Sequence, residues 1–188
     1  ERAVRVLLAL TLPVAALAAV VLRPLIAFAF GLDAVDTDLL LWVSRAYLLG
    51  LAGQCLMEVA GRSFYARQNA LIPLLGGVVN LTIFVAGAFL LYKPLGAPGI
   101  ALADAVAYSL QAMLLLALLS RKMPVRFEVG GSLMRGLLAA VVAAGVGWLT
   151  MWKLTEFSAL AGAGAALLAG AVVALPFIWR ELRLVLKM

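Results

Sequence analysis

The chain has 188 residues, of which 66% are hydrophobic and 13% are charged, and its mean hydropathy is +1.13. Soluble globular domains are about half apolar and about a quarter charged, so this composition excludes an ordinary soluble domain and predicts a membrane protein. The net charge of +6 does not indicate nucleic-acid binding, because the basic residues lie at the ends of apolar runs rather than in one patch. The chain has no histidine and one cysteine, Cys55, which excludes an internal disulfide and any site that needs several cysteines.

Six apolar segments follow one another along the chain, separated by short polar connections. They span residues 4–30, 39–61, 71–92, 100–119, 133–151 and 157–179. At a rise of about 1.5 Å per residue, each approaches or exceeds the roughly 30 Å hydrocarbon core of a bilayer. Membrane strands would be about ten residues long and would alternate in hydrophobicity, so helices are the spans that fit. The predicted fold class is all-α, a polytopic transmembrane helical bundle of about six transmembrane helices.

The connections alternate in charge, and this alternation predicts how the chain crosses the membrane. The connection 31–38 holds three aspartates and no base, 93–99 is a Pro/Gly turn, and 153–156 is a tight polar turn. Assigning alternate connections to one face places eleven basic residues there: Arg2, Arg5, Arg62, Arg67, Arg121, Lys122, Arg126, Arg135, Arg180, Arg183 and Lys187. The opposite face receives Lys93 and Lys153. The positive-inside rule therefore predicts that both termini are cytoplasmic.

The first segment and the last two have features of their own. Pro13 lies within the first segment, and Arg23-Pro24 is expected to bend or break it near its outer end. The last two segments carry small residues at every fourth position, which lets helix backbones approach closely. These residues are Gly136, Ala140 and Ala144, and then Gly162, Ala166 and Gly170. We expect two units, with four transmembrane helices of the C-terminal lobe in residues 1–122 and a C-terminal transmembrane hairpin in residues 133–188.

Charged and amide side chains inside a span are costly and are functional candidates by default. Gln54, Glu58 and Arg62 fall at i, i+4 and i+8, which places them on one face of the second helix. Two interpretations stay open: a Glu58–Arg62 pair that anchors the cytoplasmic end, or a polar surface along which a charged substrate passes. Asp104 lies about one turn inside the outer end of the fourth helix, where either simple hydration or a functional role would account for it.

Arg23 and Arg45 are the two basic residues that the assignment to the two faces leaves over. They lie inside or near the membrane, toward its outer side. Their side chains could extend to the outer headgroups, or together form a cationic outer vestibule for an anionic lipid. No enzymatic motif accompanies these residues, since the sequence has no Ser/His/Asp set, no HExxH and no Walker A run. The sequence therefore predicts neither an enzyme nor a cofactor or metal site.

The order of residues between 39 and 67 resembles a known family. Arg45-Ala-Tyr and Glu58-Val59 precede the run Arg62-Ser-Phe-Tyr-Ala-Arg67-Gln, with Pro73 a few residues later. This order resembles the tenth helix of MurJ/MviN-type lipid II flippases, in which an R-x-FYARQ-type run ends the helix at the cytoplasm. Runs around Arg23-Pro24 and Leu95-Gly96 look like the neighbouring helices of that family. The resemblance covers about residues 4 to 122, and the last two helices match in position and apolarity.

The resemblance implies that the chain is a piece of a longer protein, corresponding to helices nine to fourteen of a fourteen-helix transporter. The larger superfamily contains multidrug and oligosaccharidyl-lipid exporters. The implied activity is alternating-access transport of an undecaprenyl-linked peptidoglycan precursor across the cytoplasmic membrane of a bacterium. The hairpin 133–188 would offer a groove for the polyprenyl tail. The implied partners are this lipid substrate, membrane lipids and the N-terminal lobe of the same transporter, which the chain lacks.

The family's substrate-contacting arginines lie on helices that this chain lacks, so none can be carried over to it. The site candidates are those of the chain itself: Arg23, Arg45, Gln54, Glu58, Arg62 and Asp104. Two other functions stay open, a flippase for another polyprenyl-linked saccharide and a non-transporting membrane scaffold of the same fold.

Overall fold

The computed structural model describes residues 2–122, 130–154 and 159–186, and within these ranges every element is a helix. The helices are α1 (Arg2–Phe30), α2 (Ala34–Tyr65), α3 (Leu71–Leu95), α4 (Ala97–Lys122), α5 (Gly130–Leu154) and α6 (Ala159–Leu186). All six contain stretches long and apolar enough to cross a membrane. The all-helical class with about six spans is confirmed. Arg126, Glu156 and the start of the last predicted segment lie outside the described residues.

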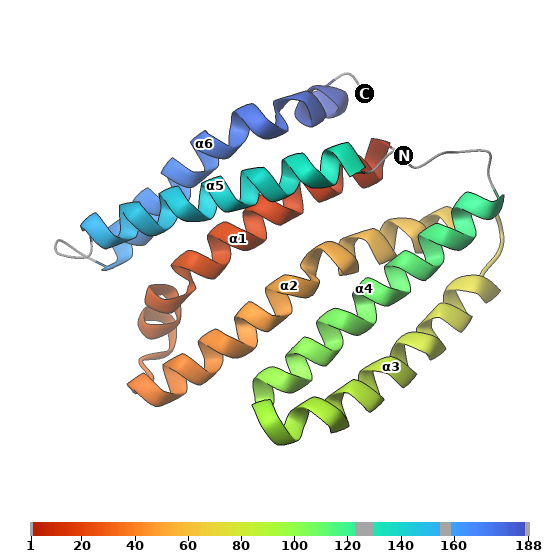
Figure 1. Ribbon diagram of the computed structural model, residues 1–188, viewed down its shortest axis with the longest axis horizontal. Coiled ribbons are helices and arrows are strands. Elements are labelled where there is room, and N and C mark those ends of the chain that lie inside the picture. The colour runs from red at the N-terminus through yellow and green to blue at the C-terminus, as the bar shows by residue number, and fades with distance from the viewer. Residues whose placement is uncertain (1, 123–129, 155–158, 187–188) are drawn as a thin grey trace.

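The six helices form two groups of three that meet at α1 and α2 (Figure 1). One group contains α1, α5 and α6, which all pack against one another, and the other contains α2, α3 and α4, in which α4 lies between α2 and α3. The chain starts and finishes at the same end of the bundle (Figure 1). Following the charge alternation, we call this end cytoplasmic and the opposite end outer. The expected division at residues 1–122 and 133–188 stays a prediction about folding units, while in space the hairpin of α5 and α6 packs on α1.

α1 is a continuous helix that contains both Pro13 and Pro24. Its ribbon changes direction in the last turns before the connection to α2 (Figure 1), where the missing N–H of Pro24 removes a backbone hydrogen bond. Asp33, three residues after the end of α1, is the N-cap of α2. Its carboxylate accepts a hydrogen bond from the backbone N–H of Asp36 at 2.8 Å. The expected aspartate loop 31–38 is therefore mostly the first turns of α2.

The group of α1, α5 and α6 is held together by small residues. The buried core includes Leu17 of α1, Ala139 and Ala143 of α5, and Ala174 of α6. The ridge predicted on α6 is confirmed, since Gly162, Ala166 and Gly170 are all buried. The ridge on α5 is shifted from the predicted one: its buried face runs through Ser132, Gly136, Ala139, Ala143 and Gly147. Ala140 and Ala144 are half-buried, because α5 is rotated toward both α1 and α6 rather than toward one partner.

α2 and α4 approach each other most closely at two glycines of α2. A Cβ atom on Gly50 would lie 2.6 Å from the Cα of Ala105, and one on Gly53 would lie 2.8 Å from the Cα of Ser109. These are distances to backbone, so no side chain can move aside to make room. Toward the cytoplasmic end, Phe64 of α2 packs against Leu115 of α4.

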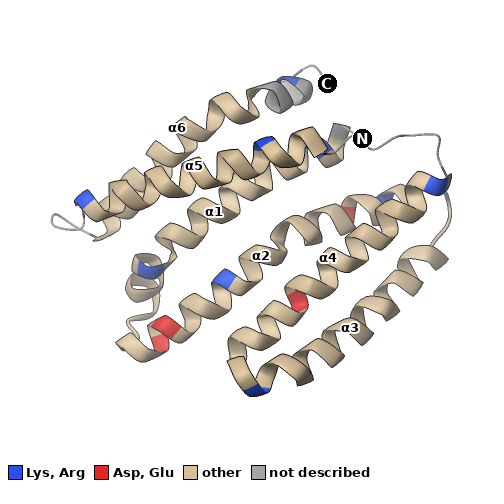
Figure 2. Cartoon of the chain, in the orientation of Figure 1, with Lys and Arg blue, Asp and Glu red and all other residues tan. Residues whose placement is uncertain are grey.

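Charged residues are concentrated near the ends of the helices, with a few inside α2 and α4 (Figure 2). The large apolar side chains of α3, including Leu74, Leu81 and Phe89, are exposed, as expected for a helix with one side against lipid. The charged positions inside the spans are therefore the places to look for function.

Candidate functional site

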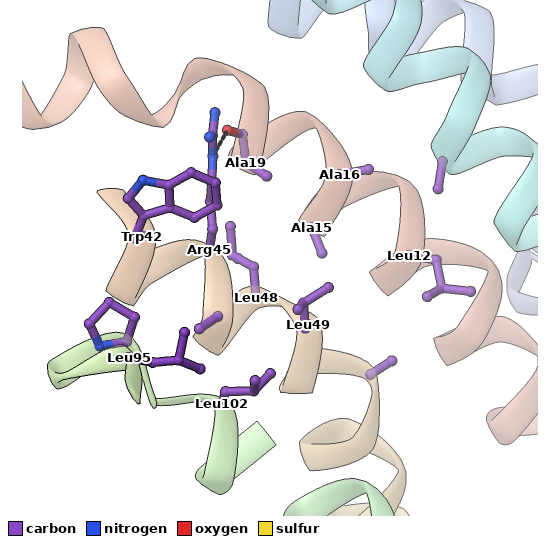
Figure 3. A pocket seen from close by; sticks show the side chains of 14 residues that line it. Leu12, Ala15, Ala16, Ala19, Trp42, Arg45, Leu48, Leu49, Leu95 and Leu102 are labelled. Atoms are coloured by element: carbon purple, nitrogen blue, oxygen red, sulfur yellow. Dashed lines mark hydrogen bonds between the residues drawn. The ribbon is translucent and has the colours of Figure 1, made fainter. Parts of the chain in front are cut away.

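Arg45 links α2 to the bent part of α1. Its Nε donates a hydrogen bond to the backbone carbonyl of Ala19 at 3.1 Å, and its Cζ lies 5.6 Å from the ring centre of Trp42 (Figure 3). The carbonyl lies on α1 about one turn before Pro24. Arg45 therefore hydrogen-bonds to the backbone of α1, while its charge lies beside the ring of Trp42 on its own helix.

Arg23 lies at the outer end of α1 and is paired with an acid that the sequence interpretation had placed in a loop. Its Nη2 lies 3.0 Å from a carboxylate oxygen of Asp38 on α2. The side chains of Arg23 and Asp38 are 60% and 50% exposed, so the ion pair contributes little to stability. The pairing also neutralises Arg23, whereas Arg45, the other cation of the expected vestibule, is paired with no carboxylate among the described residues.

Two cavities meet at Arg45. The apolar cavity has a volume of about 550 Å³ and lies mainly between α1 and α2; its walls include Leu12, Ala15, Ala19, Leu48, Leu49 and Leu102 (Figure 3). The outer cavity has a volume of about 570 Å³, and its walls include Arg23, Thr37, Trp148 and Trp152. Arg45 lines both cavities. The structure therefore brings Arg23 and Arg45 to one cavity, with two tryptophans of α5 beside them.

The second group of candidates lies toward the cytoplasmic end of α2. Gln54, Glu58 and Arg62 line one groove of about 360 Å³, together with Leu7 of α1, so the predicted common face is confirmed. The Nε of Arg62 donates to Glu58 at 2.9 Å. Both side chains are mostly exposed, at 76% and 57%. The pair is thus a solvated feature of this groove rather than a buried ion pair.

Asp104 of α4 is connected to this second group through Gln54. Its carboxylate interacts with the side-chain amide of Gln54 across the α2–α4 interface. Asp104 is half-buried, whereas Gln111, two turns further along α4, is buried. The six candidates therefore separate into an outer pair, Arg23 and Arg45, and a polar strip of Gln54, Glu58, Arg62 and Asp104.

The sequence interpretation missed the aromatic members of the outer site. Trp42, Trp148 and Trp152 line its cavities, and each lies near the outer end of its helix. Tryptophan at helix ends is typical of a membrane–water interface, so this signal was present in the sequence. Within the described ranges, no group of three His, Cys, Asp or Glu side chains is placed to hold a metal ion.

Comparison with known proteins gives a family and a fold. The family model described as Lipid II flippase MurJ matches residues 1–171. Among solved structures, the chain is similar to one titled "Lipid II flippase MurJ, inward closed conformation", with a TM-score of 0.77 and 23% identity. The match covers 93% of this chain and 37% of that one, so the chain spans little more than a third of the solved flippase. No curated protein sequence matches.

Proposed function

The chain belongs to the MurJ family of lipid II flippases, because the family model matches residues 1–171 of its 188, and we propose that it acts as the C-terminal part of such a transporter. In this proposal an N-terminal lobe completes the protein in the cytoplasmic membrane of a bacterium. The two lobes move undecaprenyl-linked peptidoglycan precursor to the outer leaflet by alternating access. The family match is the observation that carries the proposal.

Two features of the chain support a role in moving an amphiphilic lipid. The polar strip of Gln54, Glu58, Arg62 and Asp104 gives one half of the bundle a hydrophilic face, where a headgroup could be hydrated during transport. The helices α5 and α6 expose long apolar side chains such as Val141 and Leu168 to their surroundings. An isoprenoid tail needs such a surface of low polarity, so we propose that the tail runs along this hairpin.

The test is complementation in cells depleted of their own lipid II flippase, using the complete protein to which this chain belongs. Growth rescue, with lipid II reaching the outer leaflet, is the expected result. Membrane abundance must be measured in parallel, because absence of rescue is informative only when the protein is present. Normal abundance without rescue would contradict the proposal and favour another polyprenyl-linked saccharide as substrate, or a scaffold.

Arg62→Lys tests whether the Glu58–Arg62 pair is an anchor. The pair is exposed and spaced i, i+4, so it contributes only about 0.3–0.5 kcal/mol, and lysine keeps the charge. We expect unchanged thermal stability and unchanged rescue in the complementation assay. Loss of rescue at normal membrane abundance would contradict the anchor interpretation, and would mean that the guanidinium itself takes part in transport.

A further inference from the structure

Arg45 has hydrogen-bonding capacity that the described residues do not use. Its Nε is engaged by the carbonyl of Ala19, but its two terminal nitrogens have no hydrogen-bond partner in the described part of the chain. The arginines at positions 23 and 62 are each paired with a carboxylate, whereas Arg45 is paired with none among the described residues. A cation at membrane depth without a counter-ion is expensive. The arrangement therefore leaves a place for an anion that the described residues do not supply.

The depth of Arg45 indicates where that anion lies. Arg45 and Arg62 are 17 positions apart on the same helix, since 62 − 45 = 17. At the helical rise this is about 26 Å, close to the roughly 30 Å thickness of the hydrocarbon core. With Arg62 at the cytoplasmic boundary, the backbone of Arg45 lies just inside the outer boundary of the hydrocarbon core, from which its long side chain reaches toward the lipid phosphates. Trp42, in contact with Arg45, lies about one turn further out, where interfacial tryptophans are found.

The apolar cavity beside Arg45 indicates what the anion is attached to. Arg45 is the one charged residue among those lining this cavity of about 550 Å³, and the others are leucines, alanines, a tryptophan and a proline. Charge at one end and hydrocarbon along the rest match an anionic amphiphile. Along α1 the cavity extends over residues 12–19, about 10 Å of helix, which suits part of one acyl chain better than a long polyprenyl tail.

We propose that α1 and α2 bind one anionic glycerophospholipid of the outer leaflet. Its phosphate accepts hydrogen bonds from the terminal nitrogens of Arg45, and one acyl chain enters the apolar cavity. The outer cavity, which shares Arg45 and is lined by Thr37 and Trp148, receives the headgroup. The lipid would hold α2 against the bent end of α1, because its phosphate and chain contact both helices.

The test uses the complete protein, purified and titrated with phosphatidylglycerol or phosphatidylcholine, with bound lipid counted by native mass spectrometry. Three variants separate the contributions. Arg45→Gln removes the charge, and Ala15→Phe fills the cavity while the charge stays. Arg183→Gln is the matched control, since Arg183 also lies over a tryptophan, Trp179, at 5.5 Å but on α6, and it lines neither cavity.

We expect the wild type to prefer phosphatidylglycerol, and Arg45→Gln to lose about tenfold in that preference, because a charge-assisted hydrogen bond is lost. Ala15→Phe should weaken binding of both lipids, and Arg183→Gln should behave as wild type. If Arg45→Gln does not fold, Ala15→Phe carries the test.

Three results would overturn the proposal. Wild-type lipid binding in both Arg45→Gln and Ala15→Phe would show that the lipid lies elsewhere. Displacement of phosphatidylglycerol by equimolar undecaprenyl phosphate, in an Arg45-dependent manner, would assign the site to the isoprenoid lipid instead. A photo-reactive residue at Leu49 that cross-links to protein rather than lipid would show that another segment fills the cavity. All of these are measured without transport, so they leave the complementation result independent.

Discussion

Replacing Phe64 by alanine is expected to lower the free energy of unfolding by about 3 kcal/mol, because it leaves a cavity at the α2–α4 interface. Phe64 is 1% exposed and packs in a cluster with Ala60, Leu115 and Leu119. Its backbone carbonyl also accepts a hydrogen bond from Asn69 at 3.1 Å, which fixes the turn after α2. Thermal or denaturant unfolding of the purified protein in detergent measures the loss.

Phe89→Ala is the matched control for this substitution. Phe89 lies on α3 and is 79% exposed on the face expected to meet lipid, so the same truncation removes few protein contacts. We expect its effect to stay within about 0.5 kcal/mol. Equal losses for the two phenylalanines would mean that Phe64 does not occupy a packed interface, and would contradict the arrangement of α2 against α4.

Replacing Gly53 by leucine is expected to separate α2 from α4 and to cost about 3 kcal/mol, or to prevent accumulation of the folded protein. A Cβ at this position would lie 2.8 Å from the Cα and 2.9 Å from the backbone nitrogen of Ser109. Only movement of a whole helix could relieve such a contact. Membrane abundance and the melting temperature of the purified protein are the measurements.

Gly77→Leu provides the comparison, because Gly77 is also a helical glycine of a membrane span. Nothing lies within 4 Å of a Cβ placed there, and leucine has the higher helix propensity. We expect no loss of stability. A stable Gly53→Leu protein would show that α2 and α4 are not in backbone contact at Gly53.

The number of spans could be predicted from hydropathy, but the helix ends could not, because capping competes with polarity. The aspartates of residues 31–38 indicate a loop by their charge. Asp33 instead caps α2, and Asp36 lies in its first turn, where a carboxylate is favourable at the positive end of the helix dipole. The Pro/Gly turn expected over residues 93–99 is likewise a single residue in the structure. Gly96, with a φ of 63°, separates the end of α3 from the start of α4.

Which residues line a common groove could be predicted in part from the sequence, but which side chains pair with one another could not. Gln54, Glu58 and Arg62 share a groove as helical spacing requires. The Arg23–Asp38 pair depends on the direction in which α1 bends near Pro24, which local sequence does not specify. The contact of Arg45 with the carbonyl of Ala19 likewise depends on how α1 packs against α2. Gly50 and Gly53 were missed for a related reason, since a glycine becomes a contact point only through the helix that it faces.

The packing of α1 has a consequence for how the chain is made. α1 is synthesised before the other five helices, yet the small residues that cover Leu17, including Ala143 and Ala174, belong to α5 and α6. Residues inserted early must therefore remain in contact with lipid or with the insertion machinery until more than a hundred further residues have been synthesised. The α2–α4 group closes sooner, from helices that follow one another directly. Assembly of these six helices should thus end at α1, the one that was synthesised first among them.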